Sequence, residues 1–154
     1  MLRKRLFEHI APDADIRKVA AAYREALREA NRMNLTTTSP EALYTRVVDA
    51  YPFHPDLREL VGKFKENDGF QQTRGVIRLM QMVVSNLWKS EKAAGIDLIH
   101  PYDLDLNLDE IASEIRTINP SLSEAIAHDI AHSGDAEVEQ IDLANENSDA
   151  SDAA

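Results

Sequence analysis

The longest apolar run of the sequence lies between Phe70 and Trp88, and it has the spacing of an α-helix. Apolar residues recur there every three or four positions, and neighbouring apolar residues widen the face that they form. The members are Val76, Ile77, Leu79, Met80, Met82, Val83, Val84, Leu87 and Trp88. A helix that is apolar around most of its circumference is normally buried. The pattern therefore predicts a buried central helix, with Phe70 and Trp88 as core residues.

A narrow polar stripe remains on this helix, formed by Arg74, Arg78, Gln81, Ser85 and Lys89. At about 100° per residue the five positions fall within about 80° of one another on the helical wheel. The two arginines stand near the helix N-terminus, which already carries partial positive charge. An anion bound at this end would satisfy both the guanidinium groups and the free backbone N–H groups. The other interpretation is that the arginines form ion pairs with acidic residues of a neighbouring helix.

Amphipathic segments with helix-start signals surround the central helix. They are expected at about 15–33 with Asp15 as N-cap, at 40–51 with Ser39 as N-cap and Pro40 in the first turn, and at 55–64, opened by Pro55. The central helix is expected to continue to Gly95, and two more helices follow at 107–118, capped by Asn107, and 120–130. A short strand is allowed at Leu98-Ile99. The sequence thus predicts an all-α helical bundle organised around the central helix.

The charge of the chain is unevenly distributed. The net charge is −10, but residues 134–154 contain seven acidic residues and neither Lys nor Arg, so that the remainder has a net charge of only −3. The same segment is polar and poor in aromatic residues, a composition typical of disorder. We therefore expect a helical domain at 1–133 and an acidic, disordered tail at 134–154.

Composition also excludes several classes of protein and site. The chain has no cysteine, which rules out disulfides and thiolate metal sites. No apolar run approaches the roughly 20 residues of a membrane helix, so we expect no membrane contact and a cytoplasmic location. The body shows none of the basic bias typical of nucleic-acid binders, and direct nucleic-acid binding is not expected.

No complete active site is visible in the sequence. The phosphate-binding pattern G-x-x-x-x-G-K-[ST] is missing, and so is a nucleophile–base pair. His128 and His132 share one helix face, but two imidazoles are fewer ligands than a metal site needs. We therefore predict neither a metal site nor a catalytic residue in this chain.

Five segments together resemble a known family. They are RKRLFE at the start, YPFHPDL before the helix at 55, FQQTRGVIRLM on the central helix, LIHPYDL after Gly95 and AIAHDIA near residue 130. Their order and spacing are similar to the C-terminal part of a family of large bacterial P-loop ATPases of AAA+ type. That family is known as domain of unknown function 499 (DUF499) and is often linked to anti-phage or DNA-modification loci. The resemblance covers about residues 1–133.

The resemblance implies a role for the central helix. AAA+ ATPases carry a helical lid over the nucleotide, and one lid helix begins with a G-x-x-R sensor pattern, which Gly75-Val76-Ile77-Arg78 resembles. By this resemblance Arg78 would contact the γ-phosphate of ATP, with Arg74 as a second candidate. By the same resemblance, a core domain that this chain lacks would bind ATP and Mg, and this chain alone would bind neither.

Two functions are therefore open. The first is a nucleotide-sensing lid of an AAA+-type ATPase, as a fragment or a split subunit, with an AAA+ core domain or ATPase subunit as its partner and homo-oligomers in the full-length protein. In this case the isolated chain is inactive, because the phosphate loop is missing. The second is a non-catalytic helical module that binds other proteins, with the acidic tail as a solubilising or docking segment.

Overall fold

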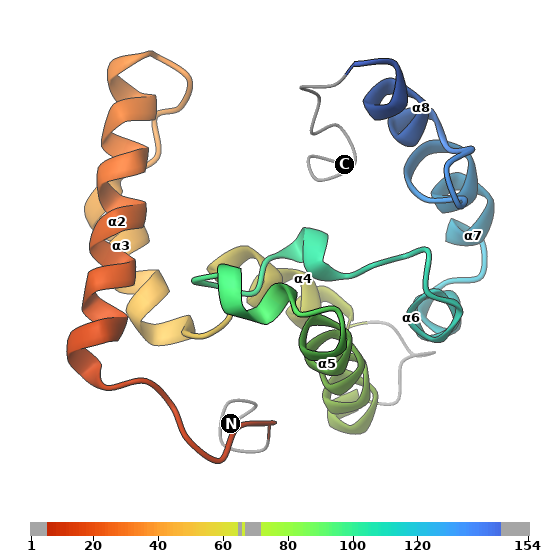
Figure 1. Ribbon diagram of the computed structural model, residues 1–154, viewed down its shortest axis with the longest axis horizontal. Coiled ribbons are helices and arrows are strands. Elements are labelled where there is room, and N and C mark those ends of the chain that lie inside the picture. Colours follow the sequence, from red (N-terminus) through yellow and green to blue (C-terminus); the bar gives the residue numbers. More distant parts are fainter. Residues whose placement is uncertain (1–5, 65, 67–71, 146–154) are drawn as a thin grey trace. The chain divides into compact units, whose positions relative to one another are not determined.

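The computed structural model describes residues 6–64, 66 and 72–145, and within these ranges the regular secondary structure is helical apart from one isolated β-bridge. The α-helices are α2 (Asp13–Arg32), α3 (Pro40–Ala50), α4 (Pro55–Phe64), α5 (Gln72–Lys89), α6 (Asp109–Ile118), α7 (Leu122–Ala125) and α8 (Glu137–Ala144) (Figure 1). Two short 3₁₀ helices, η1 (Lys92–Gly95) and η2 (Pro101–Asp103), and one π-helical turn, η3 (Ile126–Ile130), complete the list. The predicted all-α class is confirmed.

Packing divides the chain into two compact units. Unit 1 comprises Met1–Glu59 and Gly95–His100, and unit 2 comprises Leu60–Ala94 and Pro101–Ala154. Helix α4 runs through the division at Glu59. The predicted boundary between residues 133 and 134 concerns a different division of the chain and stays a prediction.

Unit 1 is built on α2 and α3, which pack side by side (Figure 1). Helix α3 begins as predicted: the hydroxyl of Ser39 accepts a hydrogen bond from the N–H of Ala42 at 3.3 Å, and Pro40 occupies the first turn. The centre of the unit is formed by the fully buried side chains of Ala20, Val47 and Leu98. Apolar burial of this kind is the main force that holds two amphipathic helices together.

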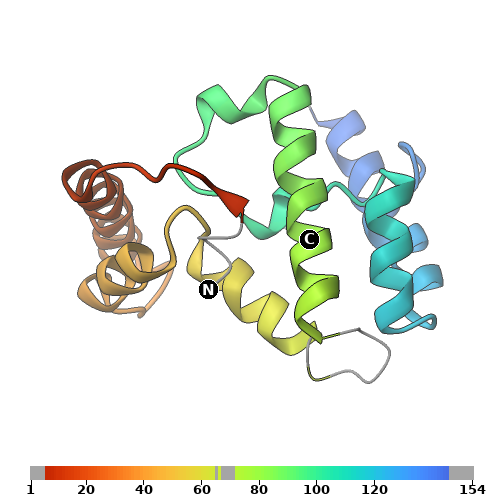
Figure 2. The ribbon, with the colours of Figure 1, turned by 90° about the horizontal axis from the view of Figure 1, so that it is seen from below.

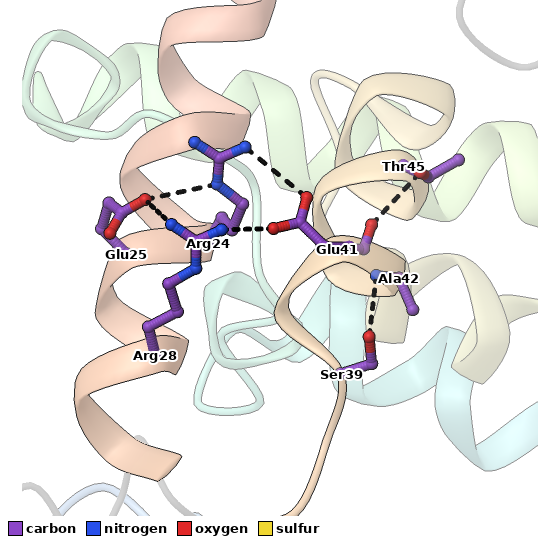
Figure 3. Close-up of polar contacts among 7 residues, drawn as sticks. All are labelled: Arg24, Glu25, Arg28, Ser39, Glu41, Ala42 and Thr45. Atoms are coloured by element: carbon purple, nitrogen blue, oxygen red, sulfur yellow. Dashed lines mark hydrogen bonds and ion pairs between the residues drawn. The ribbon is translucent and has the colours of Figure 1, made fainter. Parts of the chain in front are cut away.

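Charged side chains cross from α2 to α3 at the surface of unit 1. Figure 3 shows Glu41 of α3 between Arg24 and Arg28 of α2, with Glu25 contacting both arginines from the α2 side. Because these side chains are partly or largely exposed, each ion pair contributes little to stability by itself. These ion pairs therefore link the surfaces of α2 and α3 above their apolar contact.

The segment after Gly95 joins unit 1 through residues 51–54, which precede α4 and which we call the elbow. Ile99 forms a parallel bridge with Phe53. The N–H of His54 donates to the carbonyl of Ile99 at 2.7 Å, and the N–H of Ile99 donates to the carbonyl of Pro52 at 2.9 Å. The possible strand at Leu98-Ile99 is therefore reduced to this single bridge, which brings the two His-Pro motifs of the sequence together.

Unit 2 contains the helix that the sequence predicted as the centre of the fold. Helix α5 lies beside α6 (Figure 2). The buried side chains of α5 are Val76, Leu79, Met80, Val83 and Leu87, and α6 contributes Ile111 and Ile115. Helix α5 is therefore amphipathic, with one buried face, and the expectation of a helix buried on nearly all sides is wrong. It ends at Lys89 and not at Gly95, which terminates η1 instead.

Two predicted caps and one predicted disordered segment also need correction. Asp15 lies inside the first turn of α2, which begins after Pro12. The N-cap of α6 is Leu108, because the side chain of Asn107 is engaged elsewhere. Residues Glu137–Ala144, expected to be disordered, form α8. Residues 146–154 and Phe70 lie outside the described residues, so the predictions for them stay predictions.

Candidate functional site

The polar stripe of α5 is exposed along its whole length, as its sequence pattern predicts. Arg74, Arg78, Gln81, Ser85 and Lys89 all face solvent. Trp88, which the sequence placed in the core, is 79% exposed. The reason is its register: Trp88 follows Ser85 by three residues and Gln81 by seven, so that all six side chains fall within about 100° of the helical wheel.

Arg78 has a partner on the neighbouring helix. Its Nε atom lies 2.9 Å from Oε1 of Glu114 on α6. The Arg78 side chain is 71% exposed, whereas that of Glu114 is only 13% exposed. Glu114 lies beside the buried Ile111 on α6, at the edge of the face that Ile111 and Ile115 form. It can therefore hold one edge of the guanidinium group while most of Arg78 remains accessible.

This geometry combines features of the two interpretations that the sequence left open. Arg78 is paired with an acidic residue of a neighbouring helix, but the pair is not a buried one. A planar guanidinium group has five N–H donors, and contact with a carboxylate through Nε leaves donors for a second anion. Glu114 can thus orient Arg78 without occupying it fully.

Arg74 precedes Arg78 by one helical turn, a rise of about 6 Å. Its side chain is exposed, and it makes no ion pair within the described part of the chain. The two arginines therefore lie on the same side of α5 near its beginning. An anion with two or three oxygens, such as a terminal phosphate group, has the size and charge to contact both.

A second group of chemically active side chains gathers in unit 1. Tyr23 of α2, His54 of the elbow and His100 come from three separate segments. The hydroxyl of Tyr23 lies 2.6 Å from Nε2 of His100, and the rings of His54 and His100 stack with centroids 4.4 Å apart. The N–H of Asp56 donates to Nδ1 of His54 at 3.3 Å, which identifies that nitrogen as an acceptor.

The surroundings of His54 favour its neutral form. Burial lowers its pKa most, the nearby His100 lowers it further, Asp56 opposes the shift by raising it, and Arg46 lowers it. The stacked rings of His54 and His100 and the Tyr23 hydroxyl therefore join three segments of unit 1. The sequence contains both motifs, YPFHPDL and LIHPYDL, but it does not show that their histidines meet. The bridge between Phe53 and Ile99 brings these histidines together.

Of the two histidines considered as metal ligands, His128 contacts Asp129 through its imidazole, whereas His132 contacts Glu139 through its backbone. Nδ1 of His128 lies 2.6 Å from a carboxylate oxygen of Asp129, and this hydrogen bond and the charge of Asp129 raise the pKa of His128. The backbone N–H of His132 donates to Glu139 at 2.9 Å. Among the residues that the structure describes, no three His, Asp or Glu side chains are close enough to hold a metal ion.

Glu139 of α8 holds the end of the chain to the rest of unit 2. Its Oε2 atom accepts hydrogen bonds from the backbone N–H groups of His132, Gly134 and Ala136 at 2.9, 2.9 and 3.1 Å. Its Oε1 atom accepts one from the Asn107 side chain at 2.7 Å, and Asn107 in turn accepts one from the N–H of Ser133 at 2.6 Å. We call this set of contacts the Glu139 clamp.

The clamp strongly favours the charged form of the carboxylate. Burial raises the pKa of Glu139, but the hydrogen bonds from Asn107, His132, Ala136 and Gly134 outweigh it and lower the pKa to about 2. The sequence did not point to this residue, because it lies in a segment whose composition resembles disorder. The available signal was local: a glutamate at the third position of a helix can accept from the N–H of the N-cap residue.

The fold and this site define an all-α domain that presents two arginines at the start of one amphipathic helix. Residues 1–133 match the family model described as DUF499 second domain, so the chain belongs to the DUF499 family. Comparisons with curated proteins and with solved structures gave no match. Within the described residues, no helix is both long and apolar enough to cross a membrane.

Proposed function

We propose that this chain is a nucleotide-sensing helical lid of an AAA+-type ATPase in the cytoplasm. In this proposal Arg78 contacts the γ-phosphate of ATP that is bound by a separate core domain or subunit, and Arg74 assists. Membership of the DUF499 family supports the proposal, as does the similarity of Gly75–Arg78 to a G-x-x-R sensor pattern.

The observation that carries the proposal is that Arg78 is exposed and at the same time paired with Glu114. Its side chain is 71% exposed while one edge is held by the largely buried Glu114. A sensor must be accessible to a ligand from another domain, and it must also be oriented before the ligand arrives, since preorganised charge stabilises a phosphate without further rearrangement. An arginine that is oriented from one side and open on the other meets both needs.

The residues present fit a contact to a terminal phosphate and not a complete nucleotide site. The sequence lacks the glycine-rich phosphate loop whose backbone N–H groups hold a nucleotide, and its acidic residues show no magnesium-binding pattern. ATP and Mg would therefore be held by the partner. The role of this chain would be to add positive charge where the γ-phosphate lies.

A comparison of ATP with ADP tests the proposal, because only ATP has the γ-phosphate. The chain, assembled with its ATPase core, should lose affinity for ATP on Arg78→Ala by at least about tenfold, equivalent to about 1.4 kcal/mol, while its affinity for ADP changes little. Lys89→Ala removes an exposed cation from the other end of the same helix and should change neither affinity. Equal losses for ATP and ADP, or no loss, would contradict the sensor role.

A helical protein-interaction module is the second candidate function, and the exposure of Trp88 favours it. Tryptophan and arginine are over-represented among the residues that dominate protein interfaces, and Trp88 lies on the same stripe as Arg74 and Arg78. In this alternative Trp88→Ala weakens binding to a protein partner, and Arg78→Ala does not distinguish ATP from ADP.

A further inference from the structure

The C-terminal half of the α5 stripe presents a large aromatic side chain to solvent. Trp88 is 79% exposed, and the neighbouring Ser85 and Lys89 are exposed as well. Tryptophan is over-represented among the residues that dominate protein–protein interfaces. This part of α5 is therefore a candidate surface for binding another protein.

The charge of α5 indicates the chemistry of its partner. Lys89 is the charged residue of this part of the helix, and no residue of α5 is acidic, although the whole chain has a net charge of −10. A complementary surface would be apolar in its centre and acidic at its edge, because like charges repel and unlike charges steer two surfaces together.

Helix α8 has a surface of this kind. It contains three acidic residues and no basic one. Ile141 is 47% exposed and Leu143 is 74% exposed, and Glu137 and Ala144 are exposed with them. Glu137, Ile141 and Ala144 lie within about 60° of one another on the helical wheel, and Leu143 borders this face about 100° from Ala144.

Both surfaces remain open within one molecule. Helix α8 packs against η3, and α5 packs against α6, yet Trp88 and Leu143 are still largely exposed. The Glu139 clamp fixes α8 to the loop before it, so that α8 is ordered before it meets a partner. An ordered element loses less conformational entropy on binding than a disordered one.

We propose that α8 of one copy docks on the Ser85–Lys89 part of α5 in a second copy. Trp88 packs over Ala144 between Ile141 and Leu143, and Lys89 faces Glu137. The two surfaces differ from each other, so the contact is head to tail and joins copies into a ring or an open chain. The proposal does not use Arg78, and it stands or falls independently of nucleotide sensing.

Analytical ultracentrifugation of the chain from micromolar to millimolar concentration tests this contact. The mean mass of the wild-type protein should rise with concentration. Trp88→Ala removes the α5 surface and Leu143→Ser removes the α8 surface, and each variant alone should associate at least about 30-fold more weakly, as expected when a central contact residue is lost.

Mixing the two variants gives the sharpest readout. The Trp88→Ala chain keeps an intact α8 and the Leu143→Ser chain keeps an intact Trp88, so the mixture should form dimers that grow no further. Leu35→Ser is the matched control, because Leu35 is 71% exposed in unit 1 and should not matter. Circular dichroism verifies that each variant is folded. A wild-type chain that stays monomeric, variants that associate like the wild type, or a mixture that forms no dimer would each overturn the proposal.

Discussion

At the scale of single residues, the position of a side chain around helix α5 decides whether it lies in the core of unit 2 or at its surface. Leu87 is 3% exposed and Trp88, its neighbour in the sequence, is 79% exposed. The two side chains point about 100° apart around α5. Hydrophobicity alone placed both in the core, whereas position relative to the polar residues Gln81 and Ser85 places Trp88 at the surface.

We predict that Trp88→Ala changes the free energy of unfolding by no more than about 0.5 kcal/mol, as for most exposed substitutions. Leu79→Ala is the matched comparison on the same helix. Leu79 is 0% exposed, so its truncation should cost about 2–5 kcal/mol, the usual range for a buried leucine. Chemical denaturation at low protein concentration, where copies do not associate, measures both. A loss of several kcal/mol for Trp88→Ala would mean that this side chain is buried after all.

The sequence predicted the candidate arginines better than their partner. Exposure of Arg74 and Arg78 follows from helical periodicity alone, because the stripe stands opposite a continuous apolar face. Glu114 could not be selected in the same way, because the chain has 27 acidic residues and pairing depends on how α6 packs on α5. The cluster of Tyr23, His54 and His100 was missed for the same reason, since it joins three distant segments.

At the scale of elements, local rules succeeded where the deciding contact is local. Ser39 and Pro40 start α3 as predicted, since an N-cap hydroxyl needs only the N–H three residues later. Asn107 shows the opposite case. Its residue type predicts an N-cap, but its side-chain amide instead contacts both Ser133 and Glu139. Glu139 is 32 residues away from Asn107 in the sequence. Helix α8 forms within an acidic segment, and one of its acids, Glu139, accepts four hydrogen bonds.

The Glu139 clamp makes the attachment of α8 depend on pH. The pKa of Glu139 is about 2 in the folded chain and 4.5 as its ordinary value. A carboxyl group whose pKa is lowered by folding stabilises the folded state above its ordinary pKa. This stabilisation is therefore complete above about pH 4.5 and is lost as the pH falls from there towards 2.

We predict that Glu139→Gln weakens the clamp at neutral pH and removes most of this pH dependence. Hydrogen exchange at the amides of His132, Gly134 and Ala136 is the appropriate measurement, because these groups donate directly to the carboxylate. Their protection should fall in the variant. Glu137→Gln, which neutralises an exposed acid of the same helix, is the control and should leave the protection unchanged. Equal protection in wild type and Glu139→Gln would show that the clamp does not hold α8.

At the scale of the whole molecule, the chain is an all-α member of the DUF499 family made of two compact units. Its sequence contains no phosphate-binding loop. We predict that the isolated chain does not hydrolyse ATP, since arginines that stabilise phosphates act on a nucleotide that another element must hold. Phosphate release by the purified chain measures this. ATP hydrolysis that co-elutes with the chain through successive purification steps would contradict the prediction.

The most direct test of the sensor proposal combines the stability and the ATPase rate of Arg78→Ala. Arg78→Ala leaves the carboxylate of Glu114, which is only 13% exposed, without its ion-pair partner, so the free energy of unfolding should fall by about 1–2 kcal/mol. In assembly with an ATPase core, the hydrolysis rate should nevertheless fall at least about tenfold, because arginines at transferred phosphates can contribute on the order of 10³-fold. A folded but slow variant is the predicted result. A loss of about 3–5 kcal/mol, the cost of breaking a buried pair, or an unchanged hydrolysis rate would contradict the sensor role of Arg78.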